Sequence, residues 1–333
     1  MSAAFLLLLF FFYGWANAGE TAIFCAAGDV LLDRGCRTMI LRHGFGYLFE
    51  GVGDFIRSCD LAFCNLENPV SSSRKVSGNA ITFRADSAFV EVLKQSGFNI
   101  FNLANNHILD CGPRAIIDTR TILAANGLAA VGAGRSRDEA GAATILRKRG
   151  VRCAFLAYVH VPGFGIRSAD DSPRPAFADS AGIREGIARA RSEADIVIVS
   201  FHWGVEYTPR PTREQVDFAH LSIESGADLV IGHHPHVIQS IEKYRGKFIL
   251  YSLGNFVFDQ HVQLQRESLL FCCGFRDGRI VSPHIIPVLL PFWSFRPLFP
   301  DCRESVRISD MVKAISRGFG TTFRDSDTVV YLE

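Results

Sequence analysis

Three histidines fall within four residues in the segment Gly232-His233-His234-Pro235-His236, directly after a short apolar run. A neutral imidazole is a common ligand of Zn²⁺ and related transition metals. A lone histidine is more often a structural residue, but three of them together at the end of a strand have few structural explanations. We therefore expect this turn to bind a metal ion.

Other polar side chains lie just past the carboxyl ends of predicted strands. In an open α/β sheet the ligand crevice lies outside those ends, so separate elements would aim these side chains at one region. Carboxylates, an asparagine and imidazoles form a mixed ligand set that suits Zn²⁺, Mn²⁺ or Fe²⁺ better than Mg²⁺ or Ca²⁺. Two such ions roughly 3.5–4 Å apart support displacement at phosphorus. The residues are Asp29, Glu67, Asn105, Asn106, His107, His202, His234 and His236.

Each of these residues taken alone has an ordinary alternative role. Asp29 could stand in a solvated turn, and Asn105 and Asn106 could cap a helix. His202 precedes Trp203 and could be a structural residue in an aromatic wall. Their common position in the predicted sheet favours the metal site over these separate roles.

The elements that position this set follow a simple order. Apolar runs of strand length alternate with helical periodicity over the first two thirds of the chain, which predicts a largely parallel sheet covered by helices. The last third is richer in hairpins, one of them joined by the favoured turn Asp277-Gly278. Predicted strands cover residues 22–27, 61–65, 99–103, 195–201 and 229–231, and predicted helices cover residues 86–96, 113–126, 181–193 and 212–225.

The N-terminus differs in composition from the rest of the 333-residue chain. Residues Ala3 to Trp15 are almost wholly apolar, and Ala16-Asn17-Ala18 has the small-x-small pattern of a cleavage site. We therefore expect export, with residues 1–18 as a signal peptide or an uncleaved N-terminal anchor. The formal net charge of +1 argues against a nucleic-acid partner, because binding a nucleic-acid phosphate backbone needs a basic excess or a basic stripe.

Six segments of the chain carry a more specific pattern. They are Gly28-Asp29-Val30-Leu31-Leu32, Asn65-Leu66-Glu67-Asn68-Pro69, Asn102-Leu103-Ala104-Asn105-Asn106-His107 with Asp110 and Gly112, His202-Trp203-Gly204-Val205-Glu206-Tyr207, Gly232-His233-His234-Pro235-His236-Val237 and Ser252-Leu253-Gly254-Asn255-Phe256. In this order they resemble the capsule-synthesis protein CapA family of poly-γ-glutamate biosynthesis, within the calcineurin-like metallophosphatase superfamily. The resemblance covers about Ala22 to Gln260.

The resemblance implies an α/β fold, a four-layer α/β/β/α sandwich. We expect a CapA-type domain over residues 22–290 and a C-terminal extension packed on it over residues 291–333, with an aromatic and proline-rich start that forms a cap or irregular tail. The resemblance also implies roles for the candidate residues. Asp29 and His236 would bind a first metal ion, Glu67 would bridge, Asn106, His202 and His234 would bind a second ion, and His107 would act on the substrate as a general acid or a transition-state donor.

Two positions depart from the wider superfamily. Leu31 stands where a ligating histidine is usual, so the first ion would keep only three protein ligands and would be lost first. Ile108 stands where an acidic residue usually follows the catalytic histidine, and Asp110 would orient His107 instead. His233 would face away from the metals. Asn105, Glu206 and Asn255 would support the ligands or contact the substrate, although Glu206 could also be a buried carboxylate paired with an arginine.

Two functions fit these expectations. The first is an extracytoplasmic metal-dependent hydrolase, phosphoesterase-like, with one or two Mn²⁺, Zn²⁺ or Fe²⁺ ions per chain, acting on a phosphoester or on an amide of a γ-glutamyl polymer. The second is a non-catalytic, metal-binding accessory protein of capsule polymer synthesis or export. A third, plainer alternative is a metal-binding protein that only resembles an enzyme. Expected partners are an anionic polymer or phosphoester substrate and capsule-synthesis membrane proteins.

Overall fold

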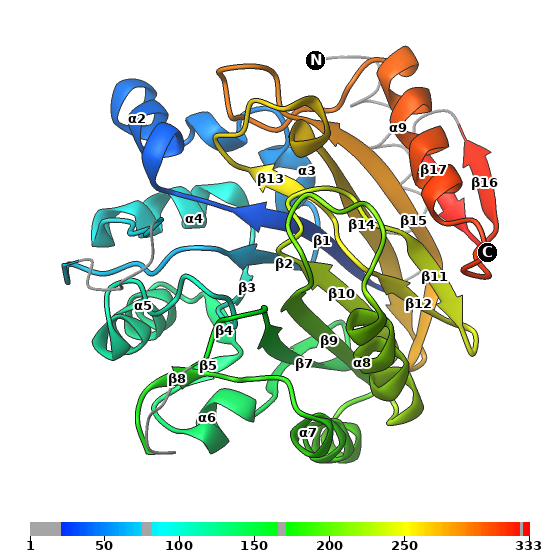
Figure 1. The fold of residues 1–333 in the computed structure, drawn as a ribbon, viewed down its shortest axis with the longest axis horizontal. Helices are drawn as coiled ribbons and strands as arrows, with labels where there is room; N and C mark the ends of the chain where they lie inside the picture. The colour runs from blue at the N-terminus through cyan, green and yellow to red at the C-terminus, as the bar shows by residue number, and fades with distance from the viewer. Residues whose placement is uncertain (1–20, 75–80, 166–170, 327–328) are drawn as a thin grey trace.

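Two β-sheets pack face to face, and helices cover the outer face of each (Figure 1). The computed structural model describes residues 21–74, 81–165, 171–326 and 329–333, so the predicted signal peptide or anchor at residues 1–18 lies outside the described residues. The arrangement confirms the expected α/β/β/α sandwich. No helix in the described part of the chain is long and apolar enough to span a bilayer.

The larger sheet has nine strands among the described residues, in the order β16-β17-β15-β14-β1-β2-β3-β4, with β13 paired to β1. Strands β1 to β4 run parallel, as the alternation of strands and helices predicts. The turn at Asp277-Gly278 joins β14 and β15 in the expected hairpin. The bounds are β1 Ala22–Val30, β2 Leu61–Leu66, β3 Ile100–Asn102, β4 Ala129–Val131, β13 Asn255–Val257, β14 Glu267–Arg276, β15 Arg279–Leu289, β16 Phe323–Ser326 and β17 Val329–Leu332.

The smaller sheet has the order β11-β12-β10-β9-β7-β6. Its four central strands run parallel, and a hairpin closes each edge. A separate two-stranded ribbon pairs β5 with β8. The bounds are β5 Ala133–Gly134, β6 Thr144–Lys148, β7 Val151–His160, β8 Arg174–Pro175, β9 Ile196–Trp203, β10 Leu229–His233, β11 Ile241–Tyr244 and β12 Lys247–Leu250.

Side-chain alternation along the strands builds three apolar layers. On β1, Phe24 faces the second sheet and Cys25 faces the helices of the first. On β7, Phe155 faces the first sheet and Leu156 packs under α7 and α8. The helices are α2 Arg34–His43, α3 Gly53–Arg57, α4 Val90–Ser96, α5 Pro113–Ala125, α6 Arg137–Gly141, α7 Ser180–Glu193, α8 Arg213–Glu224 and α9 Cys302–Ile315, with 3₁₀ turns at Tyr47–Phe49, Ser87–Phe89 and Gln263–Arg266.

The segment after residue 290 is more regular than the sequence pattern suggests. Helix α9 buries Ile308 and Val312 in the layer between the sheets, and β17 pairs with β15. Arg307 also forms an ion pair with the fully buried carboxylate of Glu267 at 2.7 Å. The cap or irregular tail expected over residues 291–303 covers the stretch before α9 and overlaps the first residues of that helix, while the domain boundary at residue 290 stays a prediction.

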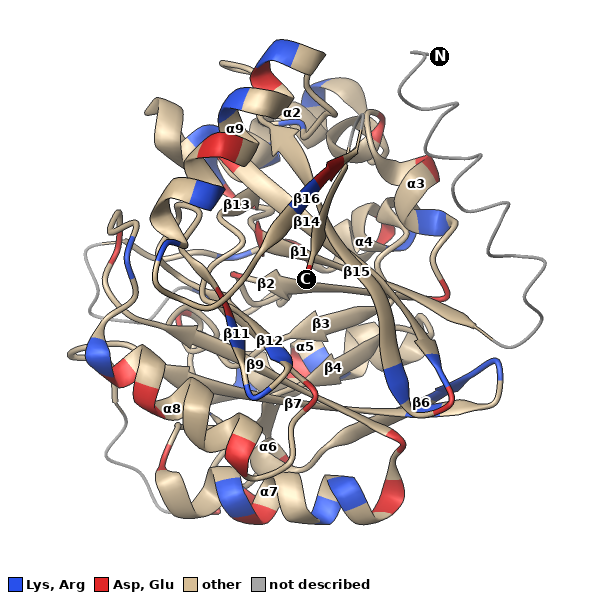
Figure 2. Cartoon of the chain, turned by 90° about the vertical axis from the view of Figure 1, so that its right-hand side faces the viewer, with Lys and Arg blue, Asp and Glu red and all other residues tan. Residues whose placement is uncertain are grey.

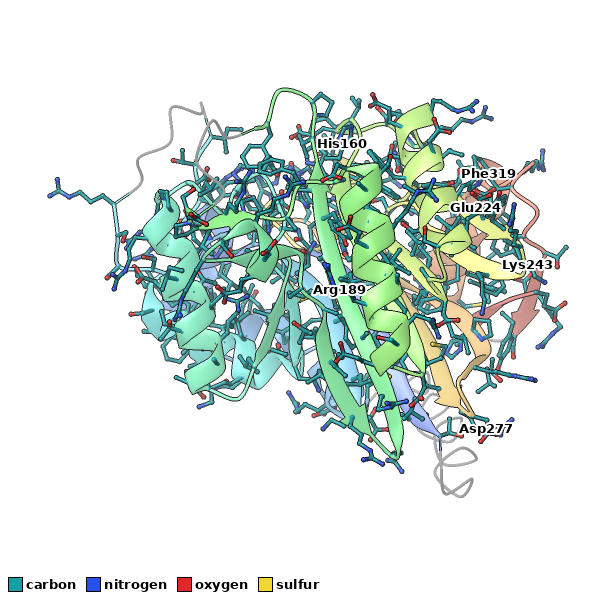
Figure 3. The ribbon with its side chains drawn as sticks, turned by 90° about the horizontal axis from the view of Figure 1, so that it is seen from below. His160, Arg189, Glu224, Lys243, Asp277 and Phe319 are labelled. Atoms are coloured by element: carbon teal, nitrogen blue, oxygen red, sulfur yellow. The ribbon has the colours of Figure 1, made fainter. Side chains whose placement is uncertain are left out.

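The two ends of the sandwich differ. His160, at the carboxyl end of β7, and Asp277, at the tip of the β14–β15 hairpin, lie at opposite ends (Figure 3). Acidic and basic residues both occur along α7 and α9 (Figure 2). The candidate residues gather at the carboxyl ends of the parallel strands, on the side of His160.

Candidate metal centre

A bulge in β1 turns Asp29 toward the second sheet. Ala26 pairs with Phe63 and Asp29 pairs with Asn65. Between these two pairs the chain advances three residues along β1 but two along β2. A one-residue bulge reverses which face the following side chain occupies. Gly28 makes the bulge possible, because a Cβ at this position would lie 1.8 Å from the carbonyl oxygen of Gly254.

The first cluster of ligand atoms combines Asp29, Glu67 and His236, all of them buried. His236 Nδ1 lies 3.5 Å from Asp29 Oδ2, and its Nε2 lies 3.3 Å from Glu67 Oε1. Asn65 donates from Nδ2 to Asp29 Oδ1 at 2.8 Å, which fixes that carboxylate. These three side chains are the ones expected at the first metal and the bridging position.

The second cluster combines Asn106, His202 and His234. His202 Nε2 lies 2.7 Å from Asn106 Oδ1 and 3.1 Å from His234 Nδ1. Glu67 lies within reach of both clusters. A carboxylate oxygen of Glu67 and one ring nitrogen from each of His234 and His236 all lie within 4.8 Å of one another. The same holds for one ligand atom each from Asp29, Glu67 and His202. The shared position of Glu67 is the geometry that a bridging carboxylate needs.

The turn after β10 holds an unusual backbone. His234 has φ 93° and His236 has φ 56°, on either side of Pro235, although residues with a Cβ rarely adopt positive φ. Tyr207, itself at φ 61°, donates its backbone N–H to the Pro235 carbonyl at 2.7 Å. Backbone strain of this kind gathers at functional sites, where neighbouring structure holds it in place.

The protonation of the ligands follows from burial and neighbouring charge. Burial raises the pKa of Glu67 to about 7. Burial would lower the pKa of His236, but the carboxylates of Glu67 and Asp29 outweigh it and raise that pKa to about 10. Burial, reinforced by His236, lowers the pKa of His234 to about 3, and burial also lowers the pKa of His202. The second cluster therefore holds neutral imidazoles, whereas the first holds a proton that a metal ion would replace.

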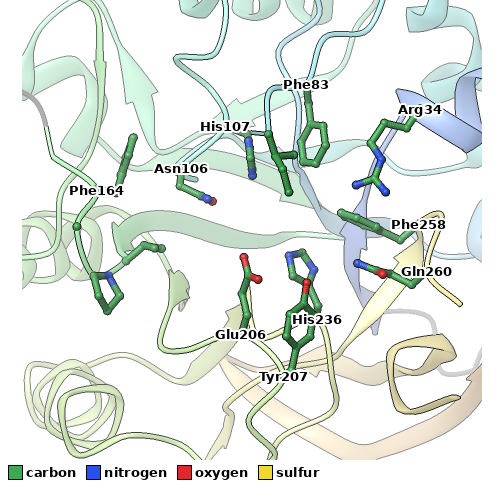
Figure 4. A pocket seen from close by; sticks show the side chains of 14 residues that line it. Arg34, Phe83, Asn106, His107, Phe164, Glu206, Tyr207, His236, Phe258 and Gln260 are labelled. Atoms are coloured by element: carbon green, nitrogen blue, oxygen red, sulfur yellow. The ribbon is translucent and has the colours of Figure 1, made fainter. Parts of the chain in front are cut away.

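His107 lies at the edge of both clusters. Its Nδ1 is 2.8 Å from Asp110 Oδ2, which also accepts the backbone N–H of Phe83 at 2.6 Å. The Asn105 side chain accepts the His107 backbone N–H at 3.1 Å and donates to the Leu66 carbonyl at 2.8 Å. The His107 ring packs on Phe83 with 4.2 Å between ring centroids and points into the adjoining cavity (Figure 4).

That cavity has a volume of about 380 Å³. Asn106, His107 and His236 form its metal-facing side, and Glu206 points its carboxylate toward the same space (Figure 4). Glu206 is exposed, so the alternative of a buried carboxylate paired with an arginine is wrong. The remaining described lining residues are Arg34, Ile81, Phe83, Val161, Pro162, Gly163, Phe164, Tyr207, Phe258 and Gln260.

The expectation that His233 faces away from the metals is wrong. Strand β10 continues through His233, which pairs with His202 across the parallel ladder and therefore points to the same face. His233 Nδ1 lies 3.5 Å from Asp29 Oδ1, and the ring is fully buried. Asn65 was not foreseen either; it lies on β2 two residues before Glu67, which follows the strand, and its Nδ2 donates to Asp29 Oδ1 at 2.8 Å and to Glu67 Oε2 at 3.4 Å.

The described residues suit divalent transition-metal ions. Buried nitrogen and oxygen atoms converge in both clusters, and Glu67 Oε1 has no hydrogen-bond partner among the described residues. Such crowding of lone pairs is costly without a cation between them. Leu31 lies in a small apolar cluster with Phe83 and Phe258, so Asp29, Glu67 and His236 are the candidate ligands that the described residues offer to a first ion.

The four-layer α/β/β/α fold is metallophosphatase-like. Haemophilus influenzae NAD nucleotidase shares the fold, with a TM-score of 0.51 and 11% identity, covering 92% of this chain and 64% of that one. Residues 23–260 match the family described as Bacterial capsule synthesis protein PGA_cap, and the chain belongs to this family.

Two named relatives agree with this assignment. PGA biosynthesis protein CapA of Bacillus subtilis is 35% identical over 276 residues, which cover 79% of this chain and 73% of the relative. Capsule biosynthesis protein CapA of Bacillus anthracis is 30% identical over 300 residues, which cover 87% of this chain and 73% of the relative. The family resemblance read from the six sequence segments is thereby confirmed.

Proposed function

We propose that this protein is a metal-dependent hydrolase of capsule polymer biosynthesis. The observation that carries the proposal is the convergence of two ligand clusters, sharing Glu67, on a cavity that His107 also enters. Asp29, Glu67 and His236 would hold one ion, and Asn106, His202 and His234 would hold the other. When bound, Mn²⁺, Zn²⁺ or Fe²⁺ would polarise a phosphoryl or carbonyl oxygen and lower the pKa of water.

The protein's own groups supply the proton transfer. In the imidazolium form, His107 donates its Nδ1–H to Asp110, and its Nε2–H faces the cavity and can pass that proton to the leaving oxygen or nitrogen, which leaves a neutral ring. A carboxylate in this position also fixes the ring orientation and tautomer. The buried walls formed by Phe83 and Phe258 limit water around this proton.

The substrate we propose is an anionic capsule polymer of the poly-γ-glutamate type or a phosphoester formed during its assembly. Capsule-synthesis membrane proteins are the proposed partners. Export, with residues 1–18 as a signal peptide or anchor, is part of the same proposal and is supported by the apolar stretch from Ala3 to Trp15.

Turnover by the purified, metal-loaded protein tests the proposal. We expect hydrolysis of bis(p-nitrophenyl) phosphate or of poly-γ-glutamate with Mn²⁺, Zn²⁺ or Fe²⁺. His234→Ala should lose most of this activity and about one ion per chain. His43→Ala, on the exposed surface of α2, is the matched control and should keep both. Absence of turnover by the wild type, or equal turnover by His234→Ala, would sink the proposal.

A second candidate is a non-catalytic accessory protein in which the metal is structural or holds polymer carboxylates. Leu31, packed with Phe83 and Phe258, is the observation that favours it, because it leaves the first ion with few ligands. A relative from Mycobacterium tuberculosis, 28% identical over 281 residues that cover 78% of this chain, is named a probable polyglutamine synthesis accessory protein. If this candidate holds, His107→Ala leaves capsule output intact while deletion of the protein abolishes it.

A further inference from the structure

Arg34 lines the cavity beside Phe83 and Phe258, and an ion pair fixes its side chain. Its Nε lies 3.0 Å from Asp259 Oδ2, an oxygen that also accepts the backbone N–H of Gly35 at 3.0 Å. The guanidinium points into the cavity (Figure 4), and the described residues offer no hydrogen-bond partner to its two Nη groups. As far as the described residues show, Arg34 therefore offers both Nη groups as N–H donors to a group that enters the cavity.

Hydrogen bonds also fix the backbone conformation of Arg34. Arg34 is the first residue of α2 and has φ 55°, a conformation disfavoured for a residue with a Cβ. Asp33 secures it, because its Oδ1 accepts the Arg34 N–H at 2.9 Å and its Oδ2 accepts the Arg84 N–H at 2.8 Å. Strained backbone that is over-determined by neighbours is a feature of ligand-binding positions.

The charges of the cavity distinguish its two sides. Of the described residues that line it, Arg34 is the one lysine or arginine, and it lies beside Phe83, with 5.8 Å from its Cζ to the ring centroid. Across the cavity, Glu206 contributes an exposed carboxylate. Arg34 thus offers an anionic group a cationic partner on a different side of the cavity from the Glu206 carboxylate.

We propose that Arg34 forms a subsite for an anionic oxygen group, carboxylate or phosphate, that the substrate carries beside the bond to be cleaved. The position of that bond rests on the proposed function, because it is the ligand clusters that mark it. A guanidinium with two free donors matches the two oxygens of such a group, and a lysine at the same place could not do so. The cavity volume of about 380 Å³ lies near the lower end for small-ligand sites, so it suits a short stretch of a polymer.

Binding of defined probes to the metal-loaded protein tests this subsite. The probes are a γ-linked glutamate pentamer, its neutral methyl ester and tripolyphosphate. Arg34→Asn, whose short side chain tolerates a left-handed backbone, should weaken binding of the pentamer about 10-fold or more, and Arg34→Lys should fall between this variant and the wild type. The methyl ester should bind wild type and Arg34→Asn equally. Arg42→Gln, an exposed arginine on the same helix, is the control and should bind like the wild type.

Asp259→Asn offers a second measurement, because it keeps an oxygen for the Gly35 N–H and loosens Arg34 alone; it should weaken pentamer binding about threefold. A loss confined to tripolyphosphate would identify phosphate as the recognised group, and a loss confined to the pentamer would identify carboxylate. The subsite is overturned if wild type and Arg34→Asn bind both anions with equal affinity, or if neither protein binds them. It is also overturned if Arg42→Gln loses as much affinity for the anions as Arg34→Asn does. If Arg34→Asn weakens binding while the metal-loaded wild type hydrolyses none of the substrates, the proposed hydrolase function is rejected and the proposed anion subsite is kept.

Discussion

Asn255 Oδ1 lies 2.9 Å from Nδ1 of His236, and this contact determines which imidazole nitrogen can serve a metal ion. The Asn255 amide nitrogen donates to the carbonyl oxygens of His236, at 3.2 Å, and Gln265, at 2.9 Å. The amide oxygen must therefore face the ring and accept the Nδ1 proton. His236 Nε2 is left to face Glu67, as a ligand of the first ion requires.

Removal of this orienting amide should weaken the first metal site. We expect Asn255→Ala to lower the affinity for the ion at Asp29, Glu67 and His236 by roughly 10–100-fold, the usual effect of losing a partner of a ligating histidine. The ion at His202 and His234 should change less. Competition with a chelator measures both affinities, and Asn126→Ala, outside the site at the end of α5, is the control. An unchanged affinity in Asn255→Ala would contradict the orienting role.

Metal binding should release protons in a pH-dependent number. With the pKa of His236 raised to about 10 and that of Glu67 to about 7, both groups hold protons below pH 6, and only His236 holds one at pH 8. An ion at the first site must displace what is bound, so its affinity rises with pH. We expect about two protons released per ion at pH 6 and about one at pH 8.

Calorimetric titration in buffers of different ionisation enthalpy counts these protons. The second cluster is the internal reference: its histidines are neutral because burial lowers the pKa of His202 and brings that of His234 to about 3. Binding there should release no imidazole proton above about pH 5. A proton count that does not vary between pH 6 and pH 8 would show that metal binding does not displace a proton from Glu67.

The sequence pattern predicted the alternation of strands and helices and the hairpin turns. It also predicted that the candidate ligands gather at the strand ends. Sequence periodicity could not predict on which face of the sheet a side chain near a strand end would lie. Asp29 reaches the site only through a bulge whose cause, the close approach of Gly254 to Gly28, is a tertiary contact. His233 was misplaced because β10 continues two residues beyond its apolar run.

Arg34 was missed for a related reason. It follows Asp29 by five residues, but its direction depends on a positive φ and on Asp259, which stands 225 residues further along the chain. Helix α9 was missed although Ile308, Met311, Val312 and Ile315 recur at helical spacing and pack into the layer between the sheets. A contact between distant segments decides the direction of Arg34, and no local pattern predicts that direction.

His107 and Asp110 should act as one unit in any hydrolysis. His107→Ala should lower kcat by about 10²–10⁴-fold, the range for loss of a general acid, without changing metal content. Asp110→Asn should lower kcat by a smaller factor, because the ring loses its carboxylate partner and its fixed tautomer. The double variant should be no worse than His107→Ala, since the carboxylate works through the imidazole. Steady-state kinetics on one substrate measure all three, and losses that multiply would show that Asp110 acts separately.

The bulge at Gly28 should be the most sensitive backbone position in the site. A Cβ there would lie 1.8 Å from the Gly254 carbonyl oxygen, and neither backbone can yield, because the Asp29 N–H donates to that same oxygen at 3.0 Å. We expect Gly28→Ala to lower the free energy of unfolding by about 3 kcal/mol or more, as overpacking against a fixed backbone does. Gly141→Ala is the matched control, since an added Cβ meets nothing within 4 Å there, and it should change the free energy by less than about 0.5 kcal/mol. Urea unfolding of both variants decides the matter: equal midpoints would mean that β1 can relax its bulge, and the orientation of Asp29 would then need another explanation.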